Sequence, residues 1–466
     1  MVEVNRRTFL KAPAFVRALA GSKPHLLLLM SDQHRGDCLG CAGHPVLRTP
    51  NLDRIAGEGV RFRHAYSSTP TCTPARTGLL TGLGPWDHGM LGYGKLAMRY
   101  RSELPRALHE DGYSTFAIGK LHYAPQRNVH GFDGALLDES GRVESPDFRS
   151  DYRAWFATEA PNLEPDATGI GWNDYTAKPY VLPERLHPTR WTGDCAVRFI
   201  ETYRRAEPFF LKVSFARPHS PYDPPQRFWD RYEAAPIPPA THAAWSEKYR
   251  GRNSDRDDIW HGDAGPEAVR RARQGYYGSV TFVDEQIGRI LEALEKQKVL
   301  DETLILYLSD HGDMTGDHFL WRKSYAYEPS ARIPFLLRMP GGGRGQISDV
   351  PVEVRDVFRI LTRRELPARE FIDLEHDVCY DRSNHWNALT DGKTKYIYHA
   401  MDGEEQLFDL AADPMETRPL DDSARLRLWR ARMIEHLQPR GEKFVKGGTL
   451  VPRPESLLYS PNHPKA

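Results

Sequence analysis

Four short apolar runs constrain the fold of this 466-residue chain more than any other feature. They span residues 25–30, 113–118, 208–215 and 304–308, and each has the length of a strand. Such runs are typical of strands that are buried on both faces of a parallel sheet. Between them, as at 280–294, apolar residues recur at the spacing of an amphipathic helix. We therefore predict an α/β fold with a large, mostly parallel sheet between helices.

Each run leads into side chains that can carry chemistry. The first ends in Asp32 and Gln33, the last in Asp310 and His311, and the other two lead to Lys120 with His122 and to His219. Parallel strands end on one rim, where open α/β sheets bind ligands, so we expect these side chains to converge. Two carboxylates, an amide oxygen and an imidazole suit a hard divalent cation, and the imidazole widens the choice toward manganese. A single carboxylate of this kind would more often be a helix cap or a surface charge.

A helix is predicted to begin close to Cys72. Pro74 suits a first helical position and Thr73 an N-cap, which places Cys72 at a helix N-terminus. Free backbone N–H groups there favour an anionic ligand, and Arg76 adds a charge suited to oxyanions. A cysteine phosphatase loop is excluded, because its arginine lies six positions after the cysteine, where this chain has Gly78. An isolated cysteine would more often be a small buried hydrophobe.

This stretch resembles the signature of the sulfatase family, which is Cys or Ser, any residue, Pro, any residue, Arg, then Thr-Gly five residues later. The matching residues are Cys72, Pro74, Arg76, Thr81 and Gly82. A second motif of the family, Gly-Tyr-x-Thr-x-x-x-Gly-Lys-x-His, is matched over residues 112–122. Residues 317–323 resemble the segment that ends in an active-site lysine, here Lys323. The resemblance covers roughly residues 24–437.

The resemblance implies an alkaline-phosphatase-like sandwich, with a large mixed sheet between helices. We expect the catalytic domain at 24–366 and a C-terminal α+β subdomain and tail at 367–466. That subdomain should contain a short antiparallel sheet with strands near 395–398 and 405–410, and a helix at 424–437.

In this family the cysteine is converted by a maturation enzyme to formylglycine, whose hydrate attacks sulfur. The resemblance thus implies a formylglycine at Cys72 that also contacts the metal. Calcium is the metal expected from the family, with manganese and magnesium as alternatives. Gln33 stands where the family often has Asp, and His311 where some members have Asn, so the identity of the ion stays open.

The family also implies roles at the matching positions. Lys120 and Lys323 would clamp the nonbridging sulfate oxygens, because charge neutralisation matters most for an anionic ester. His219 or Lys323 would protonate the leaving alcohol. His122 would take the proton of the remaining hydroxyl and so expel sulfate, and Arg76 would hold the geminal hydroxyls.

Several stretches outside the general chemistry resemble those of bacterial sulfatases that act on glycosaminoglycan fragments, notably uronate 2-O-sulfatases. They lie at 137–145, 169–174 and 384–387, and they suggest Trp172, Asn173 and His385 as sugar-binding residues. The expected substrate is therefore a sulfated carbohydrate. Two alternatives are a phosphodiesterase or phosphonate monoester hydrolase of the same fold, and an inactive protein that only binds carbohydrate.

The N-terminus and the composition bear on location and partners. Residues 5–11, Asn-Arg-Arg-Thr-Phe-Leu-Lys, resemble a twin-arginine signal, so we expect residues 1–23 to direct export to the periplasm or beyond, with a cytoplasmic location as the alternative.

The 63 basic and 63 acidic residues balance, which argues against nucleic acid as a partner. No run is long enough for stable membrane insertion. Five cysteines make a disulfide framework unexpected, and the Cys38–Cys41 pair is a weak metal signal. The oligomeric state stays open.

Overall fold

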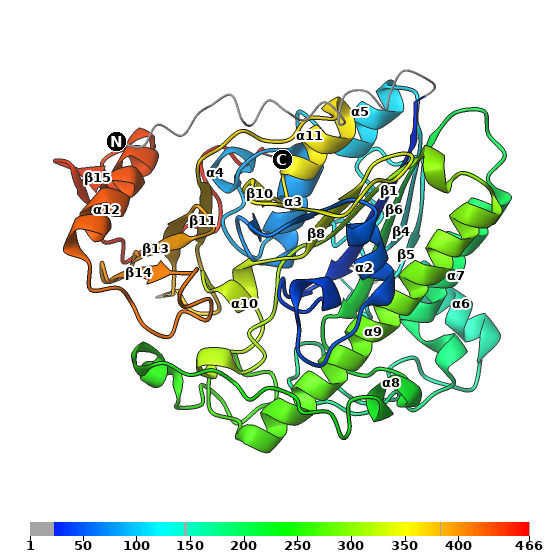
Figure 1. Cartoon of the computed structure of the whole chain (residues 1–466), viewed down its shortest axis with the longest axis horizontal. Coiled ribbons are helices and arrows are strands. Elements are labelled where there is room, and N and C mark those ends of the chain that lie inside the picture. The colour runs from blue at the N-terminus through cyan, green and yellow to red at the C-terminus, as the bar shows by residue number, and fades with distance from the viewer. Residues whose placement is uncertain (1–22, 144–146, 383, 466) are drawn as a thin grey trace.

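An eight-stranded sheet forms the centre of the molecule in the computed structural model, which describes residues 23–143, 147–382 and 384–465 (Figure 1). The strand order is β5-β4-β6-β1-β7-β8-β2-β9. Their bounds are β1 His25–Asp32, β2 Val60–Phe62, β4 Ser114–Gly119, β5 Gly134–Leu137, β6 Phe209–Pro218, β7 Thr303–Ser309, β8 Phe335–Arg338 and β9 Gln346–Ser348.

The four predicted apolar runs are the adjacent strands β4, β6, β1 and β7, and these four are parallel. In the register Leu28 of β1 pairs with Lys212 of β6 and with Leu306 of β7. Strand β8 is antiparallel to β7 and to β2, which makes the sheet mixed. The prediction of a mixed, mostly parallel sheet is confirmed, and four strands deliver their carboxyl ends to one rim.

Helices cover both faces of this sheet (Figure 1). One face carries α2 Pro50–Gly57, α7 Pro188–Thr202 and α9 Pro266–Lys296, and the other carries α3 Cys72–Thr81, α5 Leu104–Glu110 and α11 Asp356–Arg363. Side chains of β1 alternate between the two layers: Leu27 and Leu29 pack with the first, Leu26 and Leu28 with the second. This alternation explains why a strand buried on both faces is apolar at every position.

A second, four-stranded antiparallel sheet lies at the end of the molecule that carries α12 Ser423–Leu437 (Figure 1). It comprises β11 Ile372–His376, β12 Trp386–Thr390, β13 Thr394–His399 and β14 Glu405–Asp409. The predicted strands near 395 and 405 and the predicted helix are present, and β11 and β12 complete the sheet. The domain boundary at 366/367 stays a prediction.

Shorter elements connect these layers. They are β3 Ala65–Tyr66, β10 Val352–Glu353, β15 Val445–Lys446, β16 Thr449–Leu450, α4 Pro85–His88, α6 Asp151–Glu159, α8 Gln226–Asp230, α10 Glu328–Ala331, and the 3-10 helices η1 Gly40–Ala42, η2 Glu184–Leu186, η3 Ala244–Tyr249, η4 Leu300–Glu302, η5 Asp317–Phe319 and η6 Gln438–Arg440. The expected twin-arginine motif at 5–11 lies outside the described residues. Among the described residues, no helix combines the length and apolar character that a bilayer crossing requires. All five cysteines are free thiols.

The start of α3 differs from the prediction. The helix begins at Cys72 itself, two residues before Pro74. Thr73 does not act as the cap, because it lies inside the helix and Thr71 occupies the N-cap position; the Thr73 hydroxyl accepts a hydrogen bond from the Gly94 N–H at 3.2 Å. Pro74 is tolerated within the first turn, where backbone N–H groups have no intrahelical acceptor. The prediction that Cys72 lies at a helix N-terminus is nevertheless confirmed.

Candidate active site

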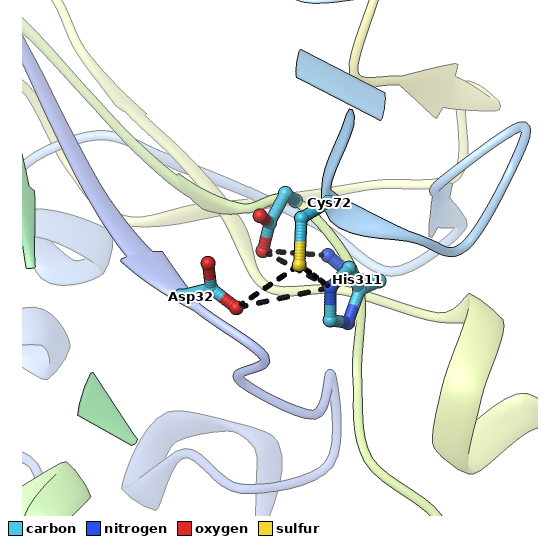
Figure 2. Close-up of side chains that lie close together, drawn as sticks. Asp32, Cys72 and His311 are labelled. Atoms are coloured by element: carbon cyan, nitrogen blue, oxygen red, sulfur yellow. Dashed lines mark hydrogen bonds and ion pairs between the residues drawn. The ribbon is translucent and has the colours of Figure 1, made fainter. Parts of the chain in front are cut away.

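Four side chains from three elements form a compact group at the rim of the sheet. Asp32 ends β1, Asp310 and His311 follow β7, and Cys72 opens α3. Their ligand atoms all lie within 4.8 Å of one another, and all four residues are buried. Figure 2 shows Asp32, Cys72 and His311 pointing toward one another. The structure therefore brings together four of the five predicted metal-site residues.

The donor atoms of this group fit a divalent cation. The Nδ1–H of His311 donates to the Gly312 carbonyl at 2.9 Å, so Nε2 is the ring nitrogen that faces the cluster. That Nε2 lies 3.1 Å from the Cys72 sulfur. The two carboxylates suit calcium, magnesium or manganese, and the imidazole widens the choice toward manganese and other transition metals. An oxygen in place of the Cys72 sulfur would make the set harder and better suited to calcium.

Buried arginine and lysine side chains compensate the two carboxylates. The Arg76 guanidinium is fully buried and donates through Nε to Asp310 Oδ2 at 2.8 Å and through Nη2 to Asp32 Oδ2 at 3.0 Å. Lys120 Nζ lies 2.7 Å from the same Asp32 oxygen. Burial alone would raise the pKa of Asp32, but the positive charges of Lys120 and Arg76 hold it well below its usual range. Asp32 is therefore ionised and able to bind a cation.

Gln33 takes a different orientation from the four clustered residues. Its amide oxygen accepts a hydrogen bond from Lys323 Nζ at 2.8 Å, and its amide nitrogen donates to Asp313. The backbone at Gln33 has a φ of 69°, a left-handed conformation that is uncommon outside glycine. This orientation ties Gln33 to Lys323, and its place as a metal ligand stays a prediction.

Lys323 and His219 form a direct pair beside the group. Lys323 Nζ lies 2.6 Å from His219 Nε2, and the His219 Nδ1–H donates to the Ser220 carbonyl at 2.8 Å. The Nε2 atom is thus an acceptor, and the proton between the two side chains belongs to Lys323. Burial, then Lys323 and Lys120, hold the pKa of His219 well below its usual range. Of the two predicted acids, this arrangement favours Lys323.

His122 is placed by a glutamate that the sequence analysis did not assign to the site. Glu139 Oε1 accepts the backbone N–H groups of Leu121 and His122, each at 3.0 Å. The turn has a φ of 62° at His122. Burial, then Arg142, hold the pKa of His122 well below its usual range, so its imidazole is neutral and can accept a proton. The available signal for Glu139 was its position two residues after β5, at the same rim.

The three predicted sugar-binding residues are not all in one place. Trp172 stacks on the His219 ring with centroids 4.1 Å apart, and its ring lies 4.6 Å from Lys120 Nζ. Asn173 follows directly, with a φ of 88°. His385 is buried in the C-terminal part, and its two ring nitrogens face the carbonyls of Arg382 and Arg453. Trp172 therefore borders the candidate site, whereas His385 has no ring nitrogen left for a sugar.

The fold and this group of residues define a hydrolase of the alkaline-phosphatase-like class. The sequence matches the sulfatase family over residues 24–362. It is 35% identical to an arylsulfatase of Clostridium perfringens, over 92% of this chain and 97% of that protein. The fold is similar to that of a phosphonate monoester hydrolase of Agrobacterium radiobacter, with a TM-score of 0.75, 24% identity, and coverage of 90% of this chain and 96% of that one.

A further similar structure contains D-glucosamine-2-N,6-O-disulfate as its substrate, with a TM-score of 0.70, 22% identity, and coverage of 91% of this chain and 98% of that one. At such identities the two solved structures support the fold alone. The extent of the family match and the identity to the arylsulfatase carry the assignment. The chain belongs to the sulfatase family. It is a sulfuric ester hydrolase, and its substrates are sulfate esters.

Proposed function

We propose that this enzyme removes sulfate from the end of a sulfated carbohydrate, such as a uronate 2-O-sulfate derived from a glycosaminoglycan. One observation carries the catalytic part: Cys72 meets Asp32, Asp310 and His311 within 4.8 Å, at the rim that also presents Lys120 and Lys323. The carbohydrate part rests on the sequence resemblance at 137–145 and 169–174, and on Trp172 at the border of the site.

The residues of the chain can be assigned to steps of sulfate ester hydrolysis. When bound, a divalent cation such as calcium neutralises the ester, and a hydrated formylglycine at position 72 supplies the attacking hydroxyl. Asp32 and Asp310 would hold the cation, while Arg76 keeps both carboxylates in place. Lys120 and Lys323 would bind sulfate oxygens, because fixed positive charge in a buried site stabilises developing negative charge.

Two proton transfers complete the proposal. Lys323 carries the proton of the Lys323–His219 pair, so it would protonate the leaving alcohol oxygen. Lys323 would then be a neutral amine that still donates an N–H group to His219 Nε2. Neutral His122, on the turn that Glu139 holds, would accept the proton of the second hydroxyl and release sulfate.

The test requires the modified enzyme. The protein is produced with a formylglycine-generating maturation enzyme, and peptide mass spectrometry is used to detect an aldehyde at position 72. Desulfation is then measured on unsaturated heparin and chondroitin disaccharides with defined sulfate positions. We expect turnover of one position, and no turnover by the Cys72→Ala variant. A modified protein that releases no sulfate from any of these disaccharides would contradict the carbohydrate part.

The same preparation separates the alternatives. An aryl sulfate and an aryl phosphate diester are compared, because a phosphonate hydrolase has a similar fold. Preferred turnover of the sulfate supports our proposal. Absence of the aldehyde after coexpression would favour a protein that binds carbohydrate without turnover.

We also propose export through the twin-arginine-like motif at residues 5–11. Fractionation tests the export of the protein from cells that produce the full chain. The control is a double variant, Arg6→Lys with Arg7→Lys. Retention of both proteins in the cytoplasm would exclude export.

A further inference from the structure

A cavity of about 370 Å³ adjoins the candidate active site. Trp172, which stacks on His219, lines it, and so does Arg142 beside His122. Other walls come from the residues after β5, from the loop at 165–172 and from the end of β6. The volume lies in the range of ligand pockets, roughly 300–1,000 Å³. The cavity can therefore hold the part of a sulfate ester that extends away from sulfur.

Two buried polar atoms in the wall have no hydrogen-bond partner among the described residues. They are Asp138 Oδ2 and Thr168 Oγ1. Asp138 is 1% exposed and Thr168 is 3% exposed. The other Asp138 oxygen accepts the Ser140 N–H at 3.0 Å, which fixes the orientation of the carboxyl group. A buried polar atom without a partner is costly, so these two atoms indicate a site that a ligand completes.

The charges of the wall favour a neutral ligand over an anionic one. Its three arginines are already paired with carboxylates: Arg217 with Asp223 at 2.8 Å, Arg142 with Glu139 at 2.7 Å, and Arg153 with Asp166. Asp138 has no ion-pair partner within the described part of the chain and adds an acidic acceptor. A sugar carboxylate or a second sulfate would be repelled by the Asp138 carboxyl group, and the arginines described in the wall are already paired with other carboxylates. Hydroxyl groups, in contrast, can donate to it.

We infer that this cavity binds a neutral, hydroxyl-bearing sugar ring of the sulfate ester, with Asp138 and Thr168 as residues that determine specificity. Asp138 accepts hydrogen bonds from sugar hydroxyls, Thr168 adds one more, and the Trp172 ring supplies an apolar wall. The inference rests on the proposed function: it keeps a sulfated carbohydrate as the substrate and replaces the uronate given there as an example with a neutral sugar. A neutral monosaccharide sulfate is preferred over a uronate sulfate.

The test compares Asp138→Asn and Thr168→Val with Asp166→Asn in the modified holoenzyme. Asp166 lines the same cavity, but its side chain is 73% exposed and already paired with Arg153. The substrates are 4-nitrophenyl sulfate, which has no hydroxyl group, a panel of neutral monosaccharide sulfates and an unsaturated uronate 2-sulfate. For the best neutral sugar, Asp138→Asn should raise KM on the order of 10- to 100-fold with kcat nearly unchanged. Turnover of 4-nitrophenyl sulfate should stay unchanged. Asp166→Asn should match the wild type on the neutral sugars, and any gain should be limited to the uronate sulfate, because this change frees Arg153.

The result that overturns the inference is an Asp138→Asn enzyme with the same KM for every sugar, or one impaired equally on 4-nitrophenyl sulfate. Better turnover of the uronate sulfate than of every neutral sugar would also overturn it. If the wild type hydrolyses none of these esters, the proposed function fails, and the cavity is examined separately. Ligand-observed NMR with unsulfated glucose, galactose and N-acetylglucosamine then decides: binding lost in Asp138→Asn supports the inference, and no binding to the wild type overturns it.

Discussion

Two buried lysines have opposite electrostatic surroundings. Lys212 lies in the middle of β6, and its Nζ has no hydrogen-bond or ion-pair partner in the described structure, only the Tyr123 ring at 5.7 Å. Burial, then Arg76, lower its pKa from 10.5 to about 7. Lys395 of β13 lies 2.8 Å from both Glu328 and Glu416, and these carboxylates outweigh burial and raise its pKa.

Lys212→Met should therefore stabilise the protein and Lys395→Met should destabilise it. The folded-state pKa of Lys212 lies below the unfolded one, so its cost is complete below about pH 7 and disappears as the pH rises toward 10.5. We expect Lys212→Met to raise the free energy of unfolding by about 1–4 kcal/mol near pH 6, and by much less near pH 10. Lys395→Met should lower it by about 3–5 kcal/mol. Urea unfolding at both pH values measures this, and a gain for Lys212→Met that does not change with pH would contradict it.

Arg76 connects the two acidic residues of the candidate metal site. A lysine at this position has one ammonium group and cannot reproduce the separate contacts from Nε to Asp310 and from Nη2 to Asp32. Arg76→Lys should lower kcat/KM by about 100-fold or more. It should also lower the free energy of unfolding by about 2–4 kcal/mol. Steady-state kinetics and urea unfolding measure both effects.

The matched control is Arg54→Lys, on the surface of α2. Arg54 also contacts two carboxylates, Glu58 and Glu295, each at 2.7 Å, but it is 36% exposed. Its replacement should change the free energy of unfolding by less than about 0.5 kcal/mol. If Arg76→Lys changed kcat/KM and the free energy of unfolding as little as Arg54→Lys, the bridge between Asp32 and Asp310 would have no catalytic role.

At the scale of elements, the turn after β4 depends on one carboxylate. Glu139 accepts two backbone N–H groups of this turn, and an amide oxygen at the same position could still accept both. Glu139→Gln should therefore retain most of kcat, and Glu139→Ala should lose about tenfold or more as His122 moves. Asp133→Ala is the control, because Asp133 accepts the Thr115 N–H at 2.8 Å at the other end of β4. It should reduce stability without changing kcat. Equal loss of kcat in both Ala variants would argue against positioning by Glu139.

The elements that sequence could predict are those whose signal is local. Apolar runs identified β1, β4, β6 and β7, because a strand buried on both faces is apolar throughout. The helix expected at 280–294 is the second half of α9, which begins at Pro266. Its first half packs on loops, with Gly275 so close to Tyr222 that an added Cβ would lie 2.6 Å from the Tyr222 carbonyl oxygen. This half also carries Val269, Ala272, Tyr276 and Tyr277 on its buried side, a helical apolar spacing that our prediction did not include.

The candidate site likewise has a part that could be predicted from the sequence and a part that could not. Its residue types follow from strand ends and from the two motifs, so Asp32, Cys72 and Asp310 could be assigned before any coordinates. The hydrogen-bond partner of each side chain could not be predicted. The hydrogen bonds of Gln33 to Lys323 and of His385 to backbone carbonyls depend on segments far apart in the chain. Sequence therefore indicates which groups meet, and the fold determines how they are oriented.

At the scale of the whole molecule, the C-terminal sheet holds the segment that carries Lys323. The Trp386 indole N–H donates to the Ser324 carbonyl at 3.1 Å, and the Lys323 N–H donates to the Tyr380 hydroxyl at 3.3 Å. Tyr66 of β3 and Tyr325 share one buried apolar cluster with Trp386, so the C-terminal sheet packs on β3 and on the segment next to Lys323. The position of Lys323 thus depends on residues beyond the expected boundary at 366/367.

Trp386→Phe should consequently impair catalysis from outside the large sheet. The change removes the indole N–H and a ring, so Ser324 loses a donor and Lys323 is less well placed. Trp429→Phe is the control, since Trp429 of α12 packs in the other apolar cluster of the same sheet. Both variants should lose about 1–2 kcal/mol of unfolding free energy. Only Trp386→Phe should raise KM and lower kcat, together about tenfold or more in kcat/KM, because small displacements of a charged group are costly in an active site. Equal kinetics in the two variants would show that the C-terminal sheet contributes stability alone.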